Sequence, residues 1–371
     1  MKNIPFVNLS EQWKTERKYL LKIIDKTLSS GFWIGGNEIV KLEKKLSKIC
    51  ETKYTAALNS GTDALVLAMH VLGISHNDEV ITTPNSFVAS TASIIHLGAK
   101  PVFVDVLDNQ NINPELIEKK INKNTKAIMA VHLTGRVCEM DKICKIAKKH
   151  NLFVIEDAAQ SISSKYLKKK AGSWGDIACF STHPLKNLNA TGDGGFITTN
   201  SKKLYGKIIE LRNHGMTKSR NQIYDFSYVS RMDSIQAAIL NFRIKNLNKI
   251  IKQRRENAKN YMKYLNTDNI FIPSETKNEF NTYHTFVVQV DYRSELIKFL
   301  KKNNISTSIH YPVPIHKFGA YKRRFNQQKE SYPVTEIQSK RILSLPINQT
   351  IGHTEIKYIS ETINKFYKDY K

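Results

Sequence analysis

The sequence predicts an α/β fold with a mainly parallel sheet flanked by helices, followed by a smaller α+β domain. Two observations lead to this prediction. Short apolar segments alternate with helical patterns through the first half of the chain, as in βαβ units, whose helices cover both faces of a parallel sheet. The chain has 371 residues, of which 41% are hydrophobic, which is enough to bury a large core in one or two domains.

The first half of the chain carries the signals of the large sheet. Its short apolar runs predict strands at residues 79–83, 100–105, 127–132, 152–157, 176–181 and 195–199. Apolar residues recur with helical spacing between several of them, which predicts helices at 62–72, 113–121 and 140–149.

A long helical pattern follows from residue 232 to residue 265. We place the domain boundary inside it, so that residues 1–250 form the large domain and residues 251–371 the small one. In the small domain we expect strands at 284–290 and 306–310, and helices at 294–302, 335–342 and 353–370. The polar, charged stretch 318–332 is expected to be a mobile loop.

The chain is strongly basic, with a formal net charge of +24. Its lysines are spread along the chain in short clusters such as 168–170 and 301–302, without a basic arm or a zinc finger. We therefore favour a solvated basic surface that helps to attract an anionic substrate, and we expect no nucleic acid partner. Binding to a polyanion is the alternative.

The cysteines and the apolar runs bear on the cellular location. The four cysteines Cys50, Cys138, Cys144 and Cys179 are scattered and lack zinc-ligand spacing, so we expect reduced thiols and no metal site. The start of the chain lacks an apolar signal region, and the run 88–99 is too short and too polar to span a membrane. These features predict a cytoplasmic protein without a membrane partner.

Lys186 and Asp157 carry the clearest chemical signal. Lys186 lies in the segment 180–188, just before the glycine-rich turn 191–195, and Asp157 ends the predicted strand 152–157. A pyridoxal phosphate enzyme needs such a pair: the lysine amine forms an imine with the cofactor aldehyde, and the carboxylate keeps the pyridine nitrogen protonated. The alternative for Asp157 is a cap for the segment that follows it.

Several residues are candidates for holding the rest of that cofactor. Ser60, Gly61 and Thr62 precede a helical pattern, where free backbone N–H groups favour a phosphate, and Ser181 supplies a second hydroxyl. Phe87 follows a strand end and is placed to stack on the pyridine ring. The alternatives are a plain helix cap at Ser60 and a core position for Phe87.

These motifs resemble the PLP-dependent sugar-nucleotide aminotransferases of the DegT type, which share fold type I with aspartate aminotransferase. The resemblance runs nearly end to end, and it is most specific where the lysine block 180–195 combines with Glu156-Asp157-Ala158-Ala159-Gln160. Further matching segments are 59–65, 78–84, 86–89, 98–106, 131–135, 230–238, 310–312 and 343–346.

The resemblance implies a role for each candidate residue. Lys186 binds the cofactor covalently and then moves protons, Asp157 pairs with the pyridinium nitrogen, and Gln160 bonds the ring hydroxyl. The remaining cofactor contacts are the phosphate ligands Ser60, Gly61, Thr62 and Ser181 and the stacking ring of Phe87. The family also implies a homodimer with residues that cross the interface.

Three positions depart from the family pattern. Val229 stands where many members have an asparagine that reaches the neighbouring subunit's phosphate, so this contact is lost or comes from a nearby residue such as Ser230. His183 stands where tyrosine or phenylalanine is common, and Thr134 stands where many members have tyrosine. His183 contacts cofactor or substrate in one interpretation and is structural in the other.

The resemblance implies an aminotransferase that takes an amino group from an amino acid, glutamate, through pyridoxamine phosphate to a nucleotide-linked keto-sugar. We expect the amino-sugar to enter surface polysaccharide biosynthesis, with amination at C3 favoured over C4. Arg231 and Arg212 are candidates for gripping the substrate diphosphate or are structural ion pairs, and His310 and Tyr311 are candidates for the sugar side. The alternatives are a PLP-dependent sugar dehydratase, in which histidine replaces this lysine, and a non-catalytic regulator that binds a nucleotide-sugar or DNA.

Overall fold

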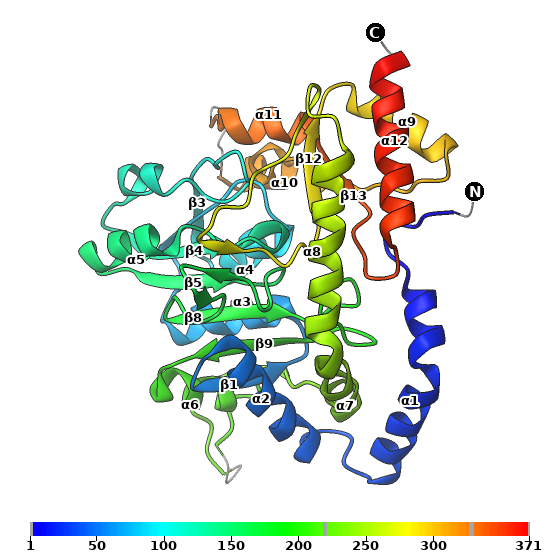
Figure 1. Ribbon diagram of the computed structural model, residues 1–371. Coiled ribbons are helices and arrows are strands. Elements are labelled where there is room, and N and C mark those ends of the chain that lie inside the picture. Colours follow the sequence, from blue (N-terminus) through cyan, green and yellow to red (C-terminus); the bar gives the residue numbers. More distant parts are fainter. Residues whose placement is uncertain (1–2, 218–220, 326–329, 370–371) are drawn as a thin grey trace.

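The computed structural model describes residues 3–217, 221–325 and 330–369, and its centre is a seven-stranded sheet (Figure 1). The strand order is β1-β9-β8-β5-β4-β2-β3. β8, β5, β4, β2 and β3 are parallel to one another, while β9 is antiparallel to both β8 and β1. The predicted α/β fold with a mainly parallel sheet is confirmed.

The strands of this sheet are short and nearly fully buried, as expected for a sheet that is covered on both faces. Their bounds are β1 Tyr54–Leu58, β2 Glu79–Thr82, β3 Lys100–Phe103, β4 Thr125–Val131, β5 Phe153–Asp157, β8 Ile177–Ser181 and β9 Gly195–Thr199. All six strands predicted in this half of the chain are present. The carboxyl ends of β1, β2, β4, β5 and β8 lie at one edge, where β9 begins.

Two groups of helices cover the sheet. On one face pack α3 (Gly61–Val71), α4 (Val88–His96) and α6 (Lys202–Leu211), which share a core with alternate residues of the strands. On the other face pack α2 (Asn37–Cys50), α5 (Met140–Lys149) and α7 (Ser234–Arg243). The long α1 (Leu9–Ser29) lies against α7.

A second, smaller sheet has the order β10-β12-β13 and its own apolar core. Its strands are β10 Ile270–Phe271, β12 Phe286–Val290 and β13 Ile342–Leu345, and its helices are α8 Leu247–Tyr264, α9 Arg293–Lys302 and α12 His353–Asp369. In Figure 1, α8 runs lengthwise between the large sheet and α12. Ile4 belongs to the same core and forms a bridge with Ile305, so the start of the chain packs with its second half. The division at residue 250 stays a prediction.

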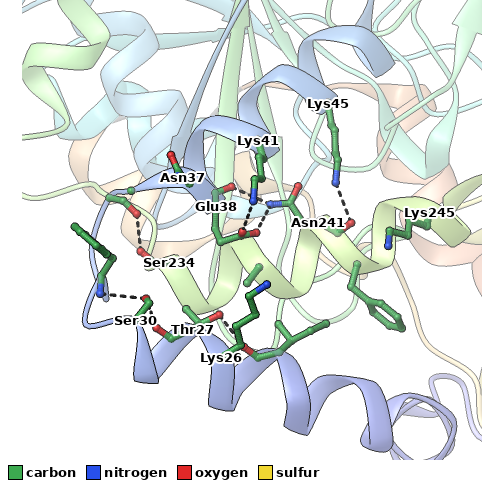
Figure 2. Close-up of a pocket in the computed structure, with 16 residues that line it drawn as sticks. Lys26, Thr27, Ser30, Asn37, Glu38, Lys41, Lys45, Ser234, Asn241 and Lys245 are labelled. Carbon is green, nitrogen blue, oxygen red and sulfur yellow. Dashed lines mark hydrogen bonds and ion pairs between the residues drawn. The ribbon is translucent and has the colours of Figure 1, made fainter.

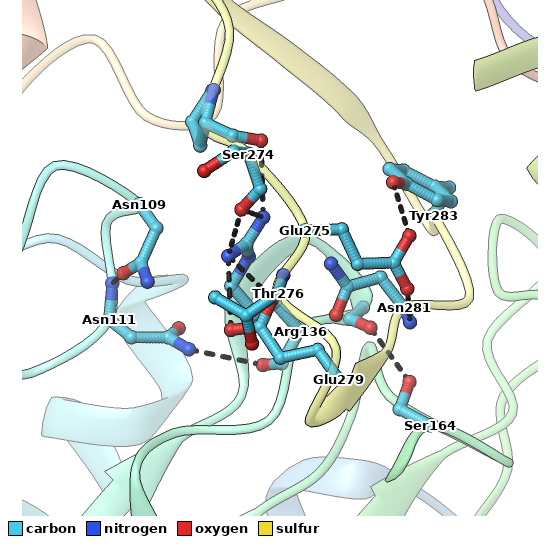
Figure 3. Close-up of polar contacts among 12 residues, drawn as sticks. Asn109, Asn111, Arg136, Ser164, Ser274, Glu275, Thr276, Glu279, Asn281 and Tyr283 are labelled. Atoms are coloured by element: carbon cyan, nitrogen blue, oxygen red, sulfur yellow. Dashed lines mark hydrogen bonds and ion pairs between the residues drawn. The ribbon is translucent and has the colours of Figure 1, made fainter. Parts of the chain in front are cut away.

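A buried arginine ties the segment before β12 to the end of β4. A third sheet, β11-β6-β7, joins Glu279–Phe280 to Lys165–Tyr166 and Lys169–Lys170. Next to it, Arg136 pairs with Glu279 at 2.9 Å, and both side chains are less than a tenth exposed. The same guanidinium donates to the carbonyls of Ser274 and Pro273 (Figure 3). This network fixes the chain where it passes from one core to the other.

Three of the predicted helices and strands differ from the structure. Residues 113–121 form two 3-10 turns, η1 Pro114–Leu116 and η2 Glu118–Lys120, because their N–H groups bond to carbonyls three residues back, as from Ile117 to Pro114 and from Lys120 to Ile117. The predicted strand 306–310 is wrong: its backbone pairs with β13 in the isolated bridge Ser308–Ser344 and forms no ladder. The long helical pattern 232–265 is divided by the 3-10 turn η4 Ile244–Asn246 into α7 and α8.

The predicted loop 318–332 contains a helix, α10 (Gly319–Phe325), whose Tyr321 packs on Phe103 with ring centroids 5.1 Å apart. Residues 326–329 of that prediction lie outside the described residues. α11 (Pro333–Arg341) follows, near its predicted place, and two further 3-10 turns are η3 (Leu133–Gly135) and η5 (Ile315–Lys317). Within the described ranges, no helix is long and apolar enough to cross a membrane.

Candidate active site

A cavity of about 440 Å³ opens at the carboxyl edge of the large sheet. Residues from both halves of the chain line it, and they include nearly all candidates named from the sequence. The candidates in the lining are Ser60, Gly61, Thr62, Phe87, Asp157, Gln160, Ser181, His183, Lys186, His310 and Tyr311. In parallel α/β sheets this edge is where ligands bind.

Lys186 reaches the cavity from a tight turn after β8. The backbone N–H of Lys186 donates to the carbonyl of His183 at 2.8 Å, and the next side chain, Asn187, donates to the carbonyl of Thr282 at 3.0 Å. These bonds fix the backbone on both sides of the lysine. Burial lowers the pKa of the Lys186 amine to about 8, against the opposing effect of the Asp157 carboxylate. About a tenth of the amine is therefore neutral at pH 7, several hundred times the fraction of an ordinary lysine, and the neutral form is the nucleophile.

Asp157 ends β5 and is buried, with 5% of its surface exposed. Ser90 on α4 donates its hydroxyl to Asp157 Oδ2 at 2.7 Å, and the backbone N–H of Ala159 donates to Oδ1 at 3.2 Å. The carboxylate therefore caps the following turn, as the alternative prediction had it, and still has lone pairs free for a ring N–H in the cavity.

The start of α3 forms the anion-binding end of the cavity. Ser60 is the N-cap of α3, and its hydroxyl accepts from the N–H of Asp63 at 3.0 Å. The first backbone N–H groups of a helix have no partner inside it, and they point at the space that Gly61, Thr62 and Ser181 surround. A Cβ added to Gly61 would lie 2.7 Å from Ser181 Cβ, so glycine is needed where the start of α3 comes this close to the end of β8.

Gln160, Tyr311 and Phe87 form a wall across the cavity. Gln160 accepts from the N–H of Thr134 at 2.8 Å and donates to the Tyr311 hydroxyl at 3.3 Å. The ring of Phe87 lies 6.0 Å from that of Tyr311 and is tilted by 45°. Phe87 is 55% exposed, which contradicts the alternative that it is a core residue and leaves its ring face available to a ligand.

Three residues of the site carried no signal in the sequence. Ser90 bonds Asp157, while Arg254 and His284 line the cavity from the second half of the chain. Arg254 donates to the carbonyls of Tyr283 and His284. No carboxylate among the described residues pairs with this guanidinium, and burial lowers its pKa to about 10. A single serine, arginine or histidine gains such a role only through the fold.

Two histidines near Lys186 are held neutral. The pKa of His284 is lowered well below its usual value, first by burial and then by the positive charge of Lys186. The pKa of His310 is lowered to about 4 for the same two reasons, and its Nδ1 lies 2.8 Å from the Ser344 hydroxyl. Neutral imidazoles here add no positive charge beside the amine. His183 is exposed at the mouth, where its Nδ1 accepts from the N–H of Leu185 at 3.3 Å.

Arg212 and Arg231 lie outside the lining of this cavity. Arg212 pairs with Glu43 at 2.6 Å and also donates to the carbonyl of Ala57, which fits the structural alternative. Arg231 donates to Asn213 Oδ1 at 2.7 Å. Val229, the departure from the family pattern, is 45% exposed and offers no polar side chain there.

The donor set of the cavity fits pyridoxal phosphate part by part. The start of α3 with Ser181 suits the phosphate, buried Asp157 suits a protonated ring nitrogen, Gln160 suits the ring hydroxyl, and the Lys186 amine suits the aldehyde. Residues 3–217, 221–325 and 330–369 contain no group of three or more His, Cys, Asp or Glu side chains that could hold a metal ion.

Comparison with known proteins supports this chemistry. A transaminase of Aneurinibacillus thermoaerophilus, named for dTDP-3-amino-3,6-dideoxy-alpha-D-galactopyranose, is 39% identical over 98% of this chain and 99% of its own. A protein of Geobacillus stearothermophilus named pleiotropic regulatory protein is 36% identical over 99% of this chain and 100% of its own. The crystal structure of DesV from S. venezuelae matches with a TM-score of 0.95 and 32% identity, covering 99% of each chain.

The family follows from these matches. The fold is that of the fold type I aminotransferases, and pyridoxal phosphate is the cofactor. The model of one family matches residues 14–364, which is nearly the whole chain. The chain belongs to the DegT/DnrJ/EryC1/StrS aminotransferase family.

Proposed function

We propose that this protein transfers the amino group of an amino acid, glutamate, to a nucleotide-linked keto-sugar. The observation that carries the proposal is the presence of Lys186, Asp157 and Gln160 around one cavity with the start of α3. The name of the Aneurinibacillus relative, a transaminase for a dTDP-linked amino-sugar, supports the choice of substrate class.

Each of three residues, Lys186, Asp157 and Gln160, has a separate role in such a reaction. When bound, pyridoxal phosphate supplies an aldehyde and a ring that accepts electrons. The amine of Lys186, with a pKa of about 8, is both nucleophile and proton carrier, since it takes up and returns a proton near neutral pH. Asp157, oriented by Ser90, holds a positive charge on the ring nitrogen. Gln160, fixed by Thr134 and Tyr311, would hold the ring hydroxyl.

The acceptor sugar is proposed to enter at the exposed mouth of the cavity. Phe87 and His183 are exposed there, and Tyr311 and His310 line the wall beside them. A net charge of +24 favours the approach of a diphosphate from solution. We propose amination at C3, which the 3-amino-sugar in the name of the Aneurinibacillus relative supports, and a product used in surface polysaccharide.

Two other functions stay open to test. A sugar dehydratase on the same scaffold would release its amino group, and the lysine at position 186 argues against it because the related dehydratases have histidine there. A regulator is the second candidate, since the Geobacillus relative bears that description. Against it, a binding protein needs neither a lysine amine of lowered pKa nor a buried carboxylate that would pair with a ring nitrogen.

The experiment supplies purified protein with glutamate and a panel of nucleotide-linked keto-sugars, and follows the release of 2-oxoglutarate. We expect release beyond one equivalent per cofactor only with a keto-sugar, together with a product that has gained one amino group by mass. A product that has lost a hydroxyl without gaining nitrogen would establish the dehydratase instead. The homodimer and the cytoplasmic location stay predictions, and sedimentation of the purified protein tests the first.

A further inference from the structure

A second cavity, of about 560 Å³, lies between α1, α2 and α7 (Figure 2). Its lining shares no described residue with the lining of the catalytic cavity. It therefore belongs to a different part of the large domain, and the proposed transamination makes no use of it. A volume of this size holds a small organic ligand.

The polar side of this cavity carries an excess of positive charge. Lys26 on α1, Lys41 and Lys45 on α2, and Lys245 after α7 line it together with a single carboxylate, Glu38. Four lysines and one glutamate give a net charge of +3. Lys41 pairs with Glu38 at 3.0 Å. In the part of the chain that the structure describes, the other three lysines, Lys26, Lys45 and Lys245, form no ion pair with a carboxylate.

The local electrostatics reflect this excess. The pKa of the Lys45 amine is lowered, first by burial and then by the charge of Lys245. Figure 2 shows Lys41 and Lys45 extending from α2 toward Glu38 and the backbone of Asn241, with Lys26 approaching from α1 on the other side. Lysines gathered from separate helices around one hollow are stabilised by an anion with several charges.

The remaining surface of the cavity is apolar or offers single polar atoms. Phe32, Phe242 and Ile23 form apolar walls, and Phe32 is 68% exposed. Asn241 lines the cavity with only 7% of its surface exposed, and its Oδ1 has no hydrogen-bond partner. An unpaired buried acceptor favours a ligand that brings a hydroxyl or amino group.

We propose that this cavity binds a nucleotide, with a nucleoside diphosphate as the smallest complete ligand. The lysines hold the phosphates, the exposed ring of Phe32 stacks on the base, and Asn241 accepts a hydrogen bond from the nucleoside. An inorganic anion would pair with the lysines but would make no contact with the ring of Phe32 and donate no hydrogen bond to Asn241. Because the catalytic lining is separate, the nucleotide binds in addition to the substrate.

The test is calorimetric titration of the pyridoxal phosphate-loaded protein with ADP, UDP and inorganic pyrophosphate. The key variant is the triple substitution Lys41→Gln/Lys45→Gln/Lys245→Gln. Its control, Lys298→Gln/Lys301→Gln/Lys302→Gln, removes the same charge from exposed positions on α9. We expect the first variant to weaken nucleoside diphosphate binding about tenfold or more and the control to change it by less than about twofold. Phe32→Ser should lower the affinity for nucleotides and leave the affinity for pyrophosphate unchanged.

Each outcome decides the matter. Absence of saturable binding to the unmodified protein, or equal affinity in the two triple variants, overturns the site. Pyrophosphate that binds as tightly as the nucleotides, with no effect of Phe32→Ser, overturns the nucleotide assignment. The same titration in Lys186→Ala separates this proposal from the proposed function, since the inactive variant should bind the nucleotide as the active protein does. Matching circular dichroism shows that each variant is folded.

Discussion

The pKa of the Lys186 amine is the property of the site that a pH titration tests most directly. Burial lowers this pKa from 10.5 to about 8, while the Asp157 carboxylate acts in the opposite direction. Only the neutral amine attacks an aldehyde, so its reactivity should follow this titration. The perturbation is therefore pH itself, applied to protein freed of its cofactor.

The magnitude follows from the two pKa values. At pH 8 about half of the Lys186 amine is neutral, whereas only roughly 1 in 300 of an ordinary lysine amine is neutral at that pH. The rate of aldehyde capture should thus rise about tenfold per pH unit below 8 and level off above it. Asp157→Asn removes the carboxylate that supports the ammonium form, so the plateau should begin at a lower pH.

The assay uses pyridoxal, which lacks the phosphate, and traps the adduct with borohydride at a series of pH values. Peptide mass spectrometry then shows which lysine carries the label. The reasoning would be refuted by a rate of aldehyde capture that keeps rising tenfold per pH unit up to pH 10, or by a label on lysines other than Lys186. A plateau in Asp157→Asn that moves to higher pH would show that the carboxylate acts with the opposite sign.

Three further substitutions test the cofactor site and the fold. Gly61→Ala places a Cβ 2.7 Å from that of Ser181, an overpacking cost of about 1–3 kcal/mol, so pyridoxal phosphate affinity measured by fluorescence titration should fall about tenfold or more. Ser90→Ala removes the hydroxyl that donates to Asp157, a charge-assisted bond of about 1.5–3 kcal/mol, so kcat should fall by at least about tenfold while the protein stays folded. Glu279→Ala breaks the buried ion pair of Figure 3 and should lower the free energy of unfolding in urea by about 3–5 kcal/mol.

Matched variants control these measurements. Ser93→Ala removes a buried hydroxyl from the same helix as Ser90, but one that donates to the carbonyl of Ala89, so kcat should change little. Glu361→Ala removes an exposed carboxylate that faces Lys357, and its effect on unfolding should stay below about 1 kcal/mol. Equal losses of kcat in the two serine variants would count against the role of Ser90, and equal losses of stability in the two glutamate variants would count against that of Glu279.

Sequence patterns predicted six of the seven strands of the large sheet, which are buried between two layers of helices, and missed β1, Tyr54–Leu58. The run that ends in Asp157 begins with the apolar residues 152–155, as expected for a parallel strand between two layers of helices, and the Glu156 that follows them is buried as well. The same logic failed at residues 306–310, where a strand-like sequence forms one bridge to Ser344. There His310 and Tyr311 leave the sheet to line the catalytic cavity, a demand that local patterns do not record.

The site itself was predictable where motifs carry chemistry and obscure where the fold alone creates the environment. Ser60, Asp157 and Lys186 are far apart in the chain, yet they meet because the carboxyl ends of their strands share one edge. Arg254 and His284 gave no signal, since their burial and the charges around them arise only when the second half of the chain packs over the sheet. Arg212 was a candidate for the substrate diphosphate, but the fold pairs it with Glu43 instead. Glu43 is remote in the sequence, so local patterns could not reveal this ion pair.

The most direct test of the central claim is the fate of a labelled nitrogen. Glutamate carrying ¹⁵N is incubated with the protein, pyridoxal phosphate and a nucleotide-linked keto-sugar, and the sugar product is analysed by mass spectrometry. We predict that ¹⁵N appears in the sugar and that Lys186→Ala abolishes its transfer. A sugar product without ¹⁵N, or undiminished transfer by Lys186→Ala, would contradict the claim that this lysine moves an amino group between the two substrates.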